Sequence, residues 1–261
     1  MSRGNDWGWG SARVLGLLAA FCVVALAWTR CELAAAEPMV DVRMLQRRAV
    51  WPANAAALAV GFATYGAFVL IPRLVQVPAS TGYGIGASAS ASGLFVLPYS
   101  VATLVCGALS GVVSRRWGPR TTLVAGALAA FAGYSELAFR HDSPVPVYLG
   151  SALLGCGTGL IVSAIATVVV HGVRREQTGV AVGVNAIMRT IGGAFGGQAA
   201  AAILGVGGGT AAPPPESRFT LAFCMSAGAA LAVLAAAVAM VRGSGHVPPT
   251  GGVAAAAAAT T

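Results

Sequence analysis

Seven long apolar runs follow one another along this chain, and they limit its possible folds more than any other feature. A helix needs roughly 20 mainly apolar residues to cross the hydrocarbon core of a bilayer, and each run comes close to that length. The runs are apolar on every side, whereas the strands of a membrane barrel alternate apolar and polar residues. The sequence therefore predicts an all-α integral membrane protein with about seven transmembrane helices. The runs cover residues 14–29, 50–71, 91–113, 121–139, 146–170, 179–204 and 219–241.

The scarcity of charge points to the same class of protein. Hydrophobic residues make up 57% of the chain and charged residues 9%, whereas a soluble domain carries about a quarter charged residues. All the basic residues are Arg, and the net charge is +8. A basic chain can indicate nucleic-acid binding, but these Arg residues lie in short clusters between apolar runs, as in cytoplasmic loops. We therefore expect a lipid bilayer, and not nucleic acid, as the partner.

The distribution of Arg over the loops predicts the orientation. Alternate connections place ten Arg residues on one side of the membrane, and loops rich in Arg stay in the cytoplasm. The N-terminus is then outside and the C-terminus in the cytoplasm. The ten residues are Arg30, Arg43, Arg47, Arg48, Arg115, Arg116, Arg120, Arg174, Arg175 and Arg242.

A signal peptide is the alternative interpretation of the start of the chain. Arg3 and Arg13 precede an apolar run, and residues 34–36 resemble a small-residue cleavage site. Cleavage there would place the later Arg clusters outside and invert the charge rule over the whole chain. We therefore favour a first transmembrane helix.

The chain divides into three predicted regions. Residues 1–49 comprise an external N-terminus, the first transmembrane helix and a cytoplasmic connector, in which 39–48 could form a short surface helix. Residues 50–242 form a six-helix bundle. Residues 243–261 are Gly, Pro, Ala and Thr-rich without apolar periodicity, and we expect a disordered cytoplasmic tail.

The segment after the third predicted helix holds the most specific motif. Gly107 and Gly111 would let a neighbouring helix approach closely. Arg115, Arg116 and Arg120 would neutralise helix C-terminal carbonyls and anionic lipid at the cytoplasmic surface. By charge alone, this segment is an ordinary cytoplasmic loop.

The spacing of this loop resembles the cytoplasmic-loop signature of the major facilitator superfamily, G-x-x-x-D-R-x-G-R-[RK]. Arg115 stands where that signature has Asp, and Pro119 stands where it has Arg, so an Asp-based charge relay is not expected here. The resemblance implies a cytoplasmic gate loop. Its residues would be Gly111, Arg115, Arg116, Gly118 and Arg120.

Other segments resemble the fourteen-helix drug:proton antiporters within that superfamily. The resemblance covers roughly residues 7–241 and aligns the seven predicted helices with the family's eighth to fourteenth. The family's first half, with its antiporter signature and the acids tied to proton coupling, has no counterpart in this chain. The matching segments are 7–11, 37–41 with Arg47, 72–76, 93–98 and 189–196.

The resemblance implies a transmembrane transporter, or half of one, in the plasma membrane. Its activity would be proton-coupled efflux of drugs or amphipathic small molecules by rocking of two halves about a central site. The partners would be protons, a small-molecule substrate, and a missing N-terminal half or a second copy. The alternative is a truncated, non-transporting fragment or a subunit that needs a separate N-terminal half. An isolated copy should not complete a transport cycle.

Arg189 and Asn185 are the candidates for lining a substrate cavity. Arg189 lies ten positions into its predicted helix, or about 15 Å at 1.5 Å per residue, which is about half of a ~30 Å hydrocarbon core. An Arg at that depth faces a cavity or a partner as a rule. Thr178, Asn185, Arg189, Gly192 and Gly196 fall on one helical stripe. The alternative is an Arg that reaches the cytoplasmic surface or bonds backbone carbonyls.

The acidic residues leave Arg189 without an evident partner, because none of them lies at mid-membrane. The partner would be a missing half, a second subunit or an anionic substrate. Glu136 is the one acid inside an apolar run, four residues before Arg140. An ion pair between these two side chains at the outer membrane surface explains Glu136 better than proton coupling does.

Other classes of protein lack the residues that they need. We expect no enzyme, because no catalytic constellation is present, and no cofactor or metal site. A retinal protein needs a Lys, which the chain lacks, and no motif supports a seven-helix receptor. The glycines at 155, 157 and 159 superficially resemble a phosphate loop, but without its Lys they indicate close helix packing. The odd number of cysteines and their apolar settings predict free thiols.

The predicted orientation can be checked with reporter fusions. Fluorescent protein fused after Arg120 or Thr261 should fluoresce, because both positions are expected in the cytoplasm, whereas alkaline phosphatase should be active only after Ser80. The reverse pattern would support cleavage of the first helix as a signal peptide.

Overall fold

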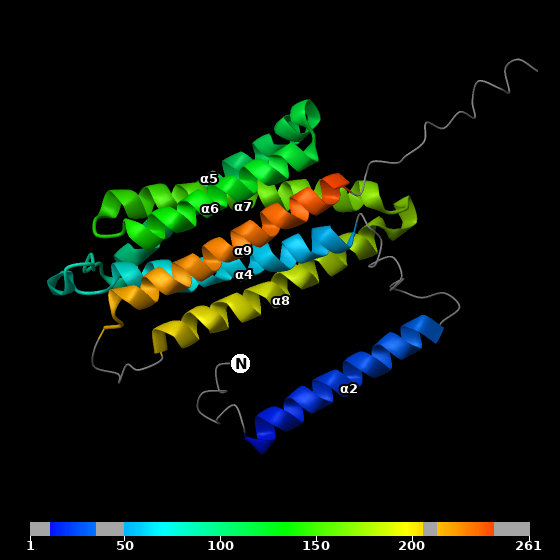
Figure 1. Ribbon diagram of the computed structural model, residues 1–261, viewed down its shortest axis with the longest axis horizontal. Helices are drawn as coiled ribbons and strands as arrows, with labels where there is room; N and C mark the ends of the chain where they lie inside the picture. Colours follow the sequence, from blue (N-terminus) through cyan, green and yellow to red (C-terminus); the bar gives the residue numbers. More distant parts are fainter. Residues whose placement is uncertain (1–10, 35–49, 206–212, 243–261) are drawn as a thin grey trace, which may run out of the picture.

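The computed structural model describes residues 11–34, 50–205 and 213–242, and this part of the chain consists of helices joined by short connections (Figure 1). Every apolar run predicted from the sequence is a helix, and most helices extend a few residues beyond the run. Two short 3-10 turns, η1 (Ala79–Thr81) and η2 (Arg175–Gln177), lie in the connections. The long helices are α2 (Ala12–Ala34), α4 (Trp51–Val75), α5 (Ala89–Trp117), α6 (Pro119–Phe139), α7 (Pro144–Gly172), α8 (Thr178–Gly205) and α9 (Glu216–Arg242).

Six of the described helices, all except α8, have the length and the apolar composition to cross a membrane. Helix α8 is long enough but less apolar, because Asn185, Arg189, Gln198 and several glycines lower its mean hydropathy. The prediction of an all-α membrane protein is confirmed. The surface helix predicted at 39–48 and the disordered tail predicted at 243–261 lie outside the described residues.

Local sequence signals fix where several helices begin. Helices α4, α6 and α7 each have Pro within their first two positions, where a missing N–H costs no hydrogen bond. Helix α5 begins after Ser88, whose hydroxyl accepts a hydrogen bond from the N–H of Ala91 at 3.2 Å. Helices α5 and α6 are joined by the single residue Gly118, which has a φ of 84°. A side chain would strain the backbone at this φ, so the tight connection requires glycine.

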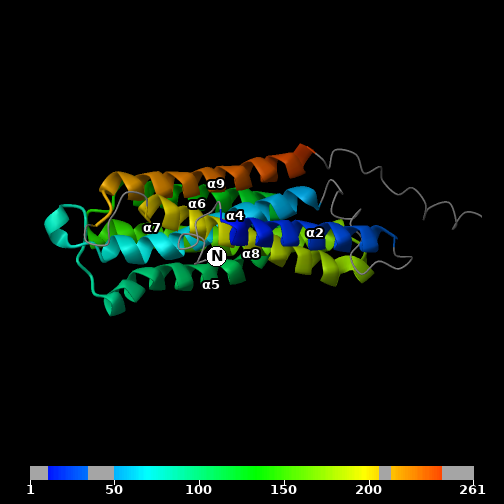
Figure 2. The ribbon, with the colours of Figure 1, turned by 90° about the horizontal axis from the view of Figure 1, so that it is seen from below.

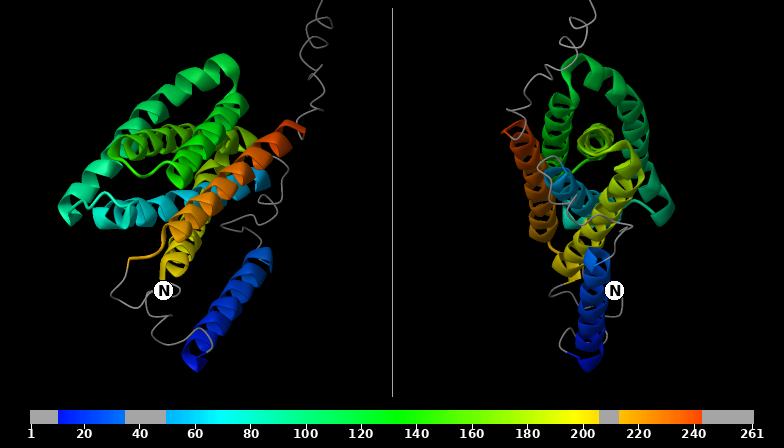
Figure 3. Two further views of the ribbon diagram at one scale, coloured as in Figure 1. Left: turned by 60° about the vertical axis from the view of Figure 1, so that its left-hand side comes forward. Right: turned by 90° about the vertical axis from the view of Figure 1, so that its right-hand side faces the viewer.

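The helices form two groups of three. Helix α4 packs along α8 and α9, and α7 packs along α5 and α6. The two groups meet mainly where α6 contacts α9 (Figures 1 and 2). Helices α5 and α8 lie on the side of the bundle opposite this contact between α6 and α9. Helix α2 lies apart from both groups, and its apolar side chains are exposed (Figure 3).

Helices α4 and α8 touch through their backbones. A Cβ on Gly192 would lie 1.9 Å from the carbonyl oxygen of Leu58, and a Cβ on Gly196 would lie 1.9 Å from that of Phe62. From the other side, a Cβ on Gly61 would lie 2.0 Å from the carbonyl oxygen of Arg189. At these three glycines no side chain fits between the two helices. Small residues at helix contacts are typical of membrane bundles, because dispersion contacts replace the hydrophobic effect there.

The glycines of α7 have the packing role predicted from the sequence. Gly155 and Gly159 face the backbone of α5, and Gly157 faces the backbone of α6. A Cβ on Gly107 of α5 would make ordinary contact with Gly159 at 3.9 Å. The same expectation was wrong for Gly111, because a Cβ there would meet nothing within 4 Å.

Two further glycine pairs of α8 have i, i+4 spacing, and only one of their four members packs closely against a neighbour. Gly179 and Gly183 have open space where a Cβ would stand. In the pair Gly193 and Gly197, the first packs against the ring of Tyr65 and the second faces open space. Spacing alone identifies a smooth helix face but not which neighbour covers it.

Two adjacent glycines of α8 provide a matched test of this packing. Gly196→Ala should destabilise the bundle by roughly 1–3 kcal/mol, because the new methyl group collides with the α4 backbone. Gly197→Ala adds the same methyl group to open space and should leave stability unchanged or raise it by up to about 1 kcal/mol. Thermal unfolding in detergent would measure both. Equal effects of the two substitutions would contradict backbone contact between α4 and α8.

Candidate functional site

A groove of about 470 Å³ lies between α4, α5, α7 and α8, on the side of the bundle away from the contact between α6 and α9. Polar side chains line part of the groove, alongside apolar lining surface. Hydroxyl groups come from all four helices, and Arg189 supplies the charge. The polar lining residues are Thr64, Tyr65, Tyr99, Thr103, Thr158, Ser163, Arg189 and Thr190.

Backbone contacts hold the walls of the groove in place. Between α5 and α7, the contact runs through Gly159, where a Cβ would lie 2.6 Å from the carbonyl oxygen of Thr103. The Thr103 hydroxyl adds a hydrogen bond to the carbonyl oxygen of Gly155 at 3.1 Å. On the other wall, Gly61 of α4 packs against the backbone of Arg189. The side chains that line the groove therefore project from fixed positions.

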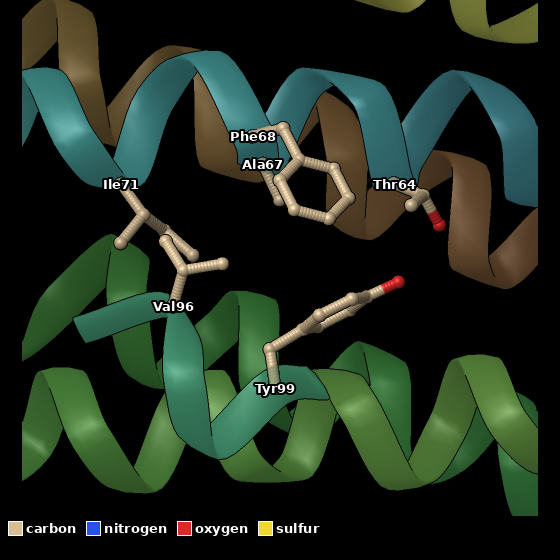
Figure 4. A pocket seen from close by; sticks show the side chains of 6 residues that line it. All are labelled: Thr64, Ala67, Phe68, Ile71, Val96 and Tyr99. Atoms are coloured by element: carbon tan, nitrogen blue, oxygen red, sulfur yellow. The ribbon is translucent and has the colours of Figure 1, made fainter. Parts of the chain in front are cut away.

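The groove closes where α4 approaches the start of α5. Figure 4 shows a small gap of about 10 Å³ beside the groove, which has room for little more than one water molecule. Thr64 and Tyr99 border both spaces, and their hydroxyls point toward the same end of the gap. Ile71 and Val96 lie at the other end. Beyond Thr64 and Tyr99, the gap is therefore lined by apolar side chains.

Arg189 lies in the groove, as its depth in the sequence predicts. Its side chain is half-buried, and it forms no ion pair or hydrogen bond with any side chain in the described part of the protein. The described carboxylates that form ion pairs, Glu136 and Glu216, bind Arg140 and His141 instead. A guanidinium in an apolar bundle is costly unless a partner occupies the space beside it.

Asn185 does not line the groove with Arg189. Its amide donates to the carbonyl oxygen of Ala53 at 3.1 Å and to Oδ1 of Asn54 at 3.1 Å. Asn185 therefore joins α8 to α4, about two turns before Gly192 and about three turns before Gly196. The stripe that the sequence singled out on α8 is largely the face that packs on α4, and Arg189 alone extends from its edge into the groove.

The arginines of the α5–α6 connection border a second, larger groove. It has a volume of about 740 Å³ and lies among the ends of α5, α6 and α7. Arg115 and Arg120 line it together with Gly111 and His171. Arg116 points elsewhere, with its guanidinium carbon 5.9 Å from the centre of the Trp117 ring. The structure thus brings together part of the predicted gate loop around one basic groove.

Gly118 and its neighbours keep this connection tight. The Gly118 N–H donates to the carbonyl oxygen of Ser114 at 2.9 Å, and the Gly118 carbonyl accepts from the hydroxyl of Thr122 at 3.1 Å. The Ser114 hydroxyl in turn donates to that of Thr122 at 3.0 Å. These hydrogen bonds fix the backbone of the turn between Arg115 and Arg120.

Glu136 lies 3.5 Å from Arg140, one turn further along α6. The side chain of Arg140 is 70% exposed and that of Glu136 is 22% exposed. This is the ion pair expected from the spacing. Glu136 does not border either groove.

A polar cluster at the end of the bundle opposite the gate loop was not predicted from the sequence. His141 is buried, with Nδ1 2.9 Å from the carbonyl oxygen of Leu137 and Nε2 3.5 Å from a carboxylate oxygen of Glu216. Tyr83 packs its ring near His141 and donates its hydroxyl to the carbonyl oxygen of Pro214. Burial, and then the negative charge of Glu216, raise the pKa of Tyr83. These residues are far apart in the sequence, and no motif links them.

Comparison with known proteins identifies similar sequences. The profile of the Major Facilitator Superfamily matches residues 4–197. Multidrug resistance protein Stp of Mycobacterium tuberculosis is 30% identical over 195 residues, which are 74% of this chain and 35% of that protein. The Tetracenomycin C resistance and export protein of Streptomyces glaucescens is 30% identical over 204 residues, 77% of this chain and 36% of that protein.

A more distant relative shows the same pattern of coverage. Multidrug transporter protein MdtP of Bacillus subtilis is 24% identical over 196 residues, which are 74% of this chain and 35% of that protein. The chain thus spans about a third of the length of the curated relatives it matches.

The hydrogen bond between Asn185 and Asn54 can be measured with a double-mutant cycle. Asn185→Ala and Asn54→Ala should show a coupling free energy of roughly 0.6–1.7 kcal/mol, as for side-chain hydrogen bonds between other membrane helices. Reversible unfolding in mixed micelles would supply the values. As a control, Asn54→Ala with Thr190→Ala should be additive, because Thr190 bonds only the carbonyl of Ala186 in its own helix. Additivity in both cycles would contradict the bond.

Proposed function

The chain belongs to the major facilitator superfamily, and from that premise we propose that it forms the C-terminal half of a transporter that exports drugs or other amphipathic small molecules. The observation that carries this proposal is the polar groove between α4, α5, α7 and α8. Secondary transporters bind substrate near the bilayer midplane between two bundles, and the groove lies midway along its four helices with hydroxyls, aromatic rings and one charge. The names of the relatives, which refer to multidrug resistance and export, support the same activity.

In the proposed arrangement, residues 1–49 provide an accessory helix and a connector, 50–242 provide the six-helix transport unit, and 243–261 provide a cytoplasmic tail. The protein resides in the plasma membrane with its N-terminus outside and its C-terminus in the cytoplasm. Substrate enters the groove from one side, and a second bundle covers its open face. That bundle is a separate N-terminal half or a second copy of this chain.

The gate loop braces the cytoplasmic end of the unit. Arg115 and Arg120 border the basic groove beside α7, and their charges stay in contact with water and lipid headgroups. Arg189 supplies the charged contact within the substrate groove. The energy for export comes from the proton gradient, through acids that the second bundle supplies, because the acids of this chain's described part lie away from the groove.

The alternative function is a non-transporting fragment or an inactive subunit. The observation that favours it is the lining of the groove, which includes no carboxylate among the described residues. The groove then has no covering bundle, and no transport cycle follows. Efflux measurements separate the two functions.

A chimera tests the proposal. In the chimera, the segment of this chain that aligns with multidrug resistance protein Stp replaces the matching 195 residues of Stp. The chimera is expressed in cells that lack their own efflux pumps. The chimera should lower the accumulation of amphipathic dyes, and a protonophore should abolish the effect. Expression of the 261-residue chain alone should leave accumulation unchanged. Intact Stp is the positive control, and a fluorescent tag confirms insertion of each protein.

Further outcomes bear on individual residues. Glu136→Gln in the chimera should leave efflux unchanged, because Glu136 pairs with Arg140 outside the groove. Slower efflux in this variant would make Glu136 a proton-coupling residue. An inserted chimera that fails to lower dye accumulation would favour the non-transporting alternative, and proton-dependent efflux by the chain alone would remove the need for a second half.

A further inference from the structure

We infer that the groove prefers aromatic substrates that carry a negative charge, such as a carboxylate, phenolate or sulfonate, over substrates that carry a positive one. The inference rests on the proposed function and specifies its substrate class. It arises from the charge of the groove and from the fixed position of the backbone that carries that charge.

Arg189 determines the electrostatics of the groove. It is the one charged side chain among the groove residues, and no carboxylate borders the space in the described part of the chain. An anionic group placed beside the guanidinium would receive charge-assisted hydrogen bonds, which are the strongest hydrogen bonds available to such a site. A cationic group would face the guanidinium across a poorly solvated space, where repulsion is screened less than in water.

The neutral lining residues do not offset this preference. Thr64, Thr158, Ser163 and the two tyrosines offer hydroxyls and ring faces. The Tyr65 side chain is 49% exposed, so its ring can stack on an aromatic ligand. A cation–π contact with a ring would attract a cation, but the same cation would stand within a groove whose net charge is already positive. Hydroxyls and rings therefore select for an aromatic frame, and Arg189 selects for the sign of its charge.

The backbone of Arg189 cannot withdraw from the groove. Gly61 packs against the carbonyl group of Arg189, and Gly192 holds the next turn of α8 against Leu58. The base of the side chain is fixed between α4 and α8, and the guanidinium has no acid to pair with in the described residues. Because its backbone is fixed at the groove, Arg189 keeps its guanidinium within reach of a ligand, and less backbone freedom is lost when the ligand binds.

Three probes with the same ring test the inference: 2-naphthoate, 2-naphthamide and 2-naphthylmethylammonium. The 261-residue chain is placed in nanodiscs of phosphatidylcholine, which has no net charge and so favours neither ion, and empty nanodiscs correct for partition into lipid. Equilibrium dialysis gives Kd for each probe. Naphthoate should bind at least about tenfold more tightly than naphthylmethylammonium, as expected for a hydrogen bond to a charged group.

Substitutions at Arg189 assign the preference to its charge. Arg189→Gln should weaken naphthoate binding by about tenfold and leave naphthamide binding nearly unchanged, whereas Arg189→Lys should retain most of the preference for the anion. Arg140→Gln removes an Arg outside the groove and is the matched control, with no expected effect. Thermal unfolding of each variant confirms that it is folded.

Several results would overturn the inference. They are equal binding of the three probes, tighter binding of the cation, no binding of naphthoate, or naphthoate binding that Arg189→Gln leaves unchanged. The last two would fit an Arg189 whose partner is a carboxylate of the second bundle. Dye efflux by the chimera together with any of these results would leave the transport proposal intact. Selective binding of naphthoate without efflux would retain the charge preference and overturn transport.

Discussion

Inside a bilayer no water is present to bond the backbone or to drive apolar surfaces together, so helices must satisfy their own hydrogen bonds and associate through close contact. In this protein that contact is made by backbone against backbone. Glycines of α8 lie on carbonyl groups of α4, and glycines of α7 lie on α5 and α6. The two groups of three helices follow from these seams, and so does the space that remains between them.

The groove depends on the same contacts. Because α4 with α8 and α5 with α7 are drawn together so closely, the residues on the facing edges of these pairs are left without neighbours. Hydroxyls and Arg189 occupy those edges, whereas the buried residues of α6 and α9 are mainly alanines, leucines and aromatic residues. Polar groups that would be costly against lipid are thus collected where a second protein surface or a ligand can cover them.

The helices were predictable because each is a long apolar run, and Arg189 was predictable because its depth makes it exceptional. The roles of the neighbouring residues on α8 were not predictable from the sequence. Periodicity placed Asn185, Gly192 and Gly196 on one face of α8, but it could not show that α4 covers that face. The contact of His141 with Glu216 joins the connection between α6 and α7 to the first residue of α9, and neither residue is unusual in its own sequence context. Local sequence patterns predict a helix and its faces, whereas the contact partners of each side chain depend on how the helices are arranged in space.

The seam between α4 and α8 also limits how this protein can move. Helices separated by interlocking side chains can slide a little as rotamers change. Where carbonyl groups of α4 pack directly on glycines of α8, no side chains lie between the two helices to permit such sliding. The two helices must therefore tilt together as one rigid unit. At the other side of the bundle, the one-residue hinge at Gly118 couples α5 to α6 just as firmly. Any rearrangement that opens or closes the groove at one end of a helix pair therefore also moves the other end of that pair.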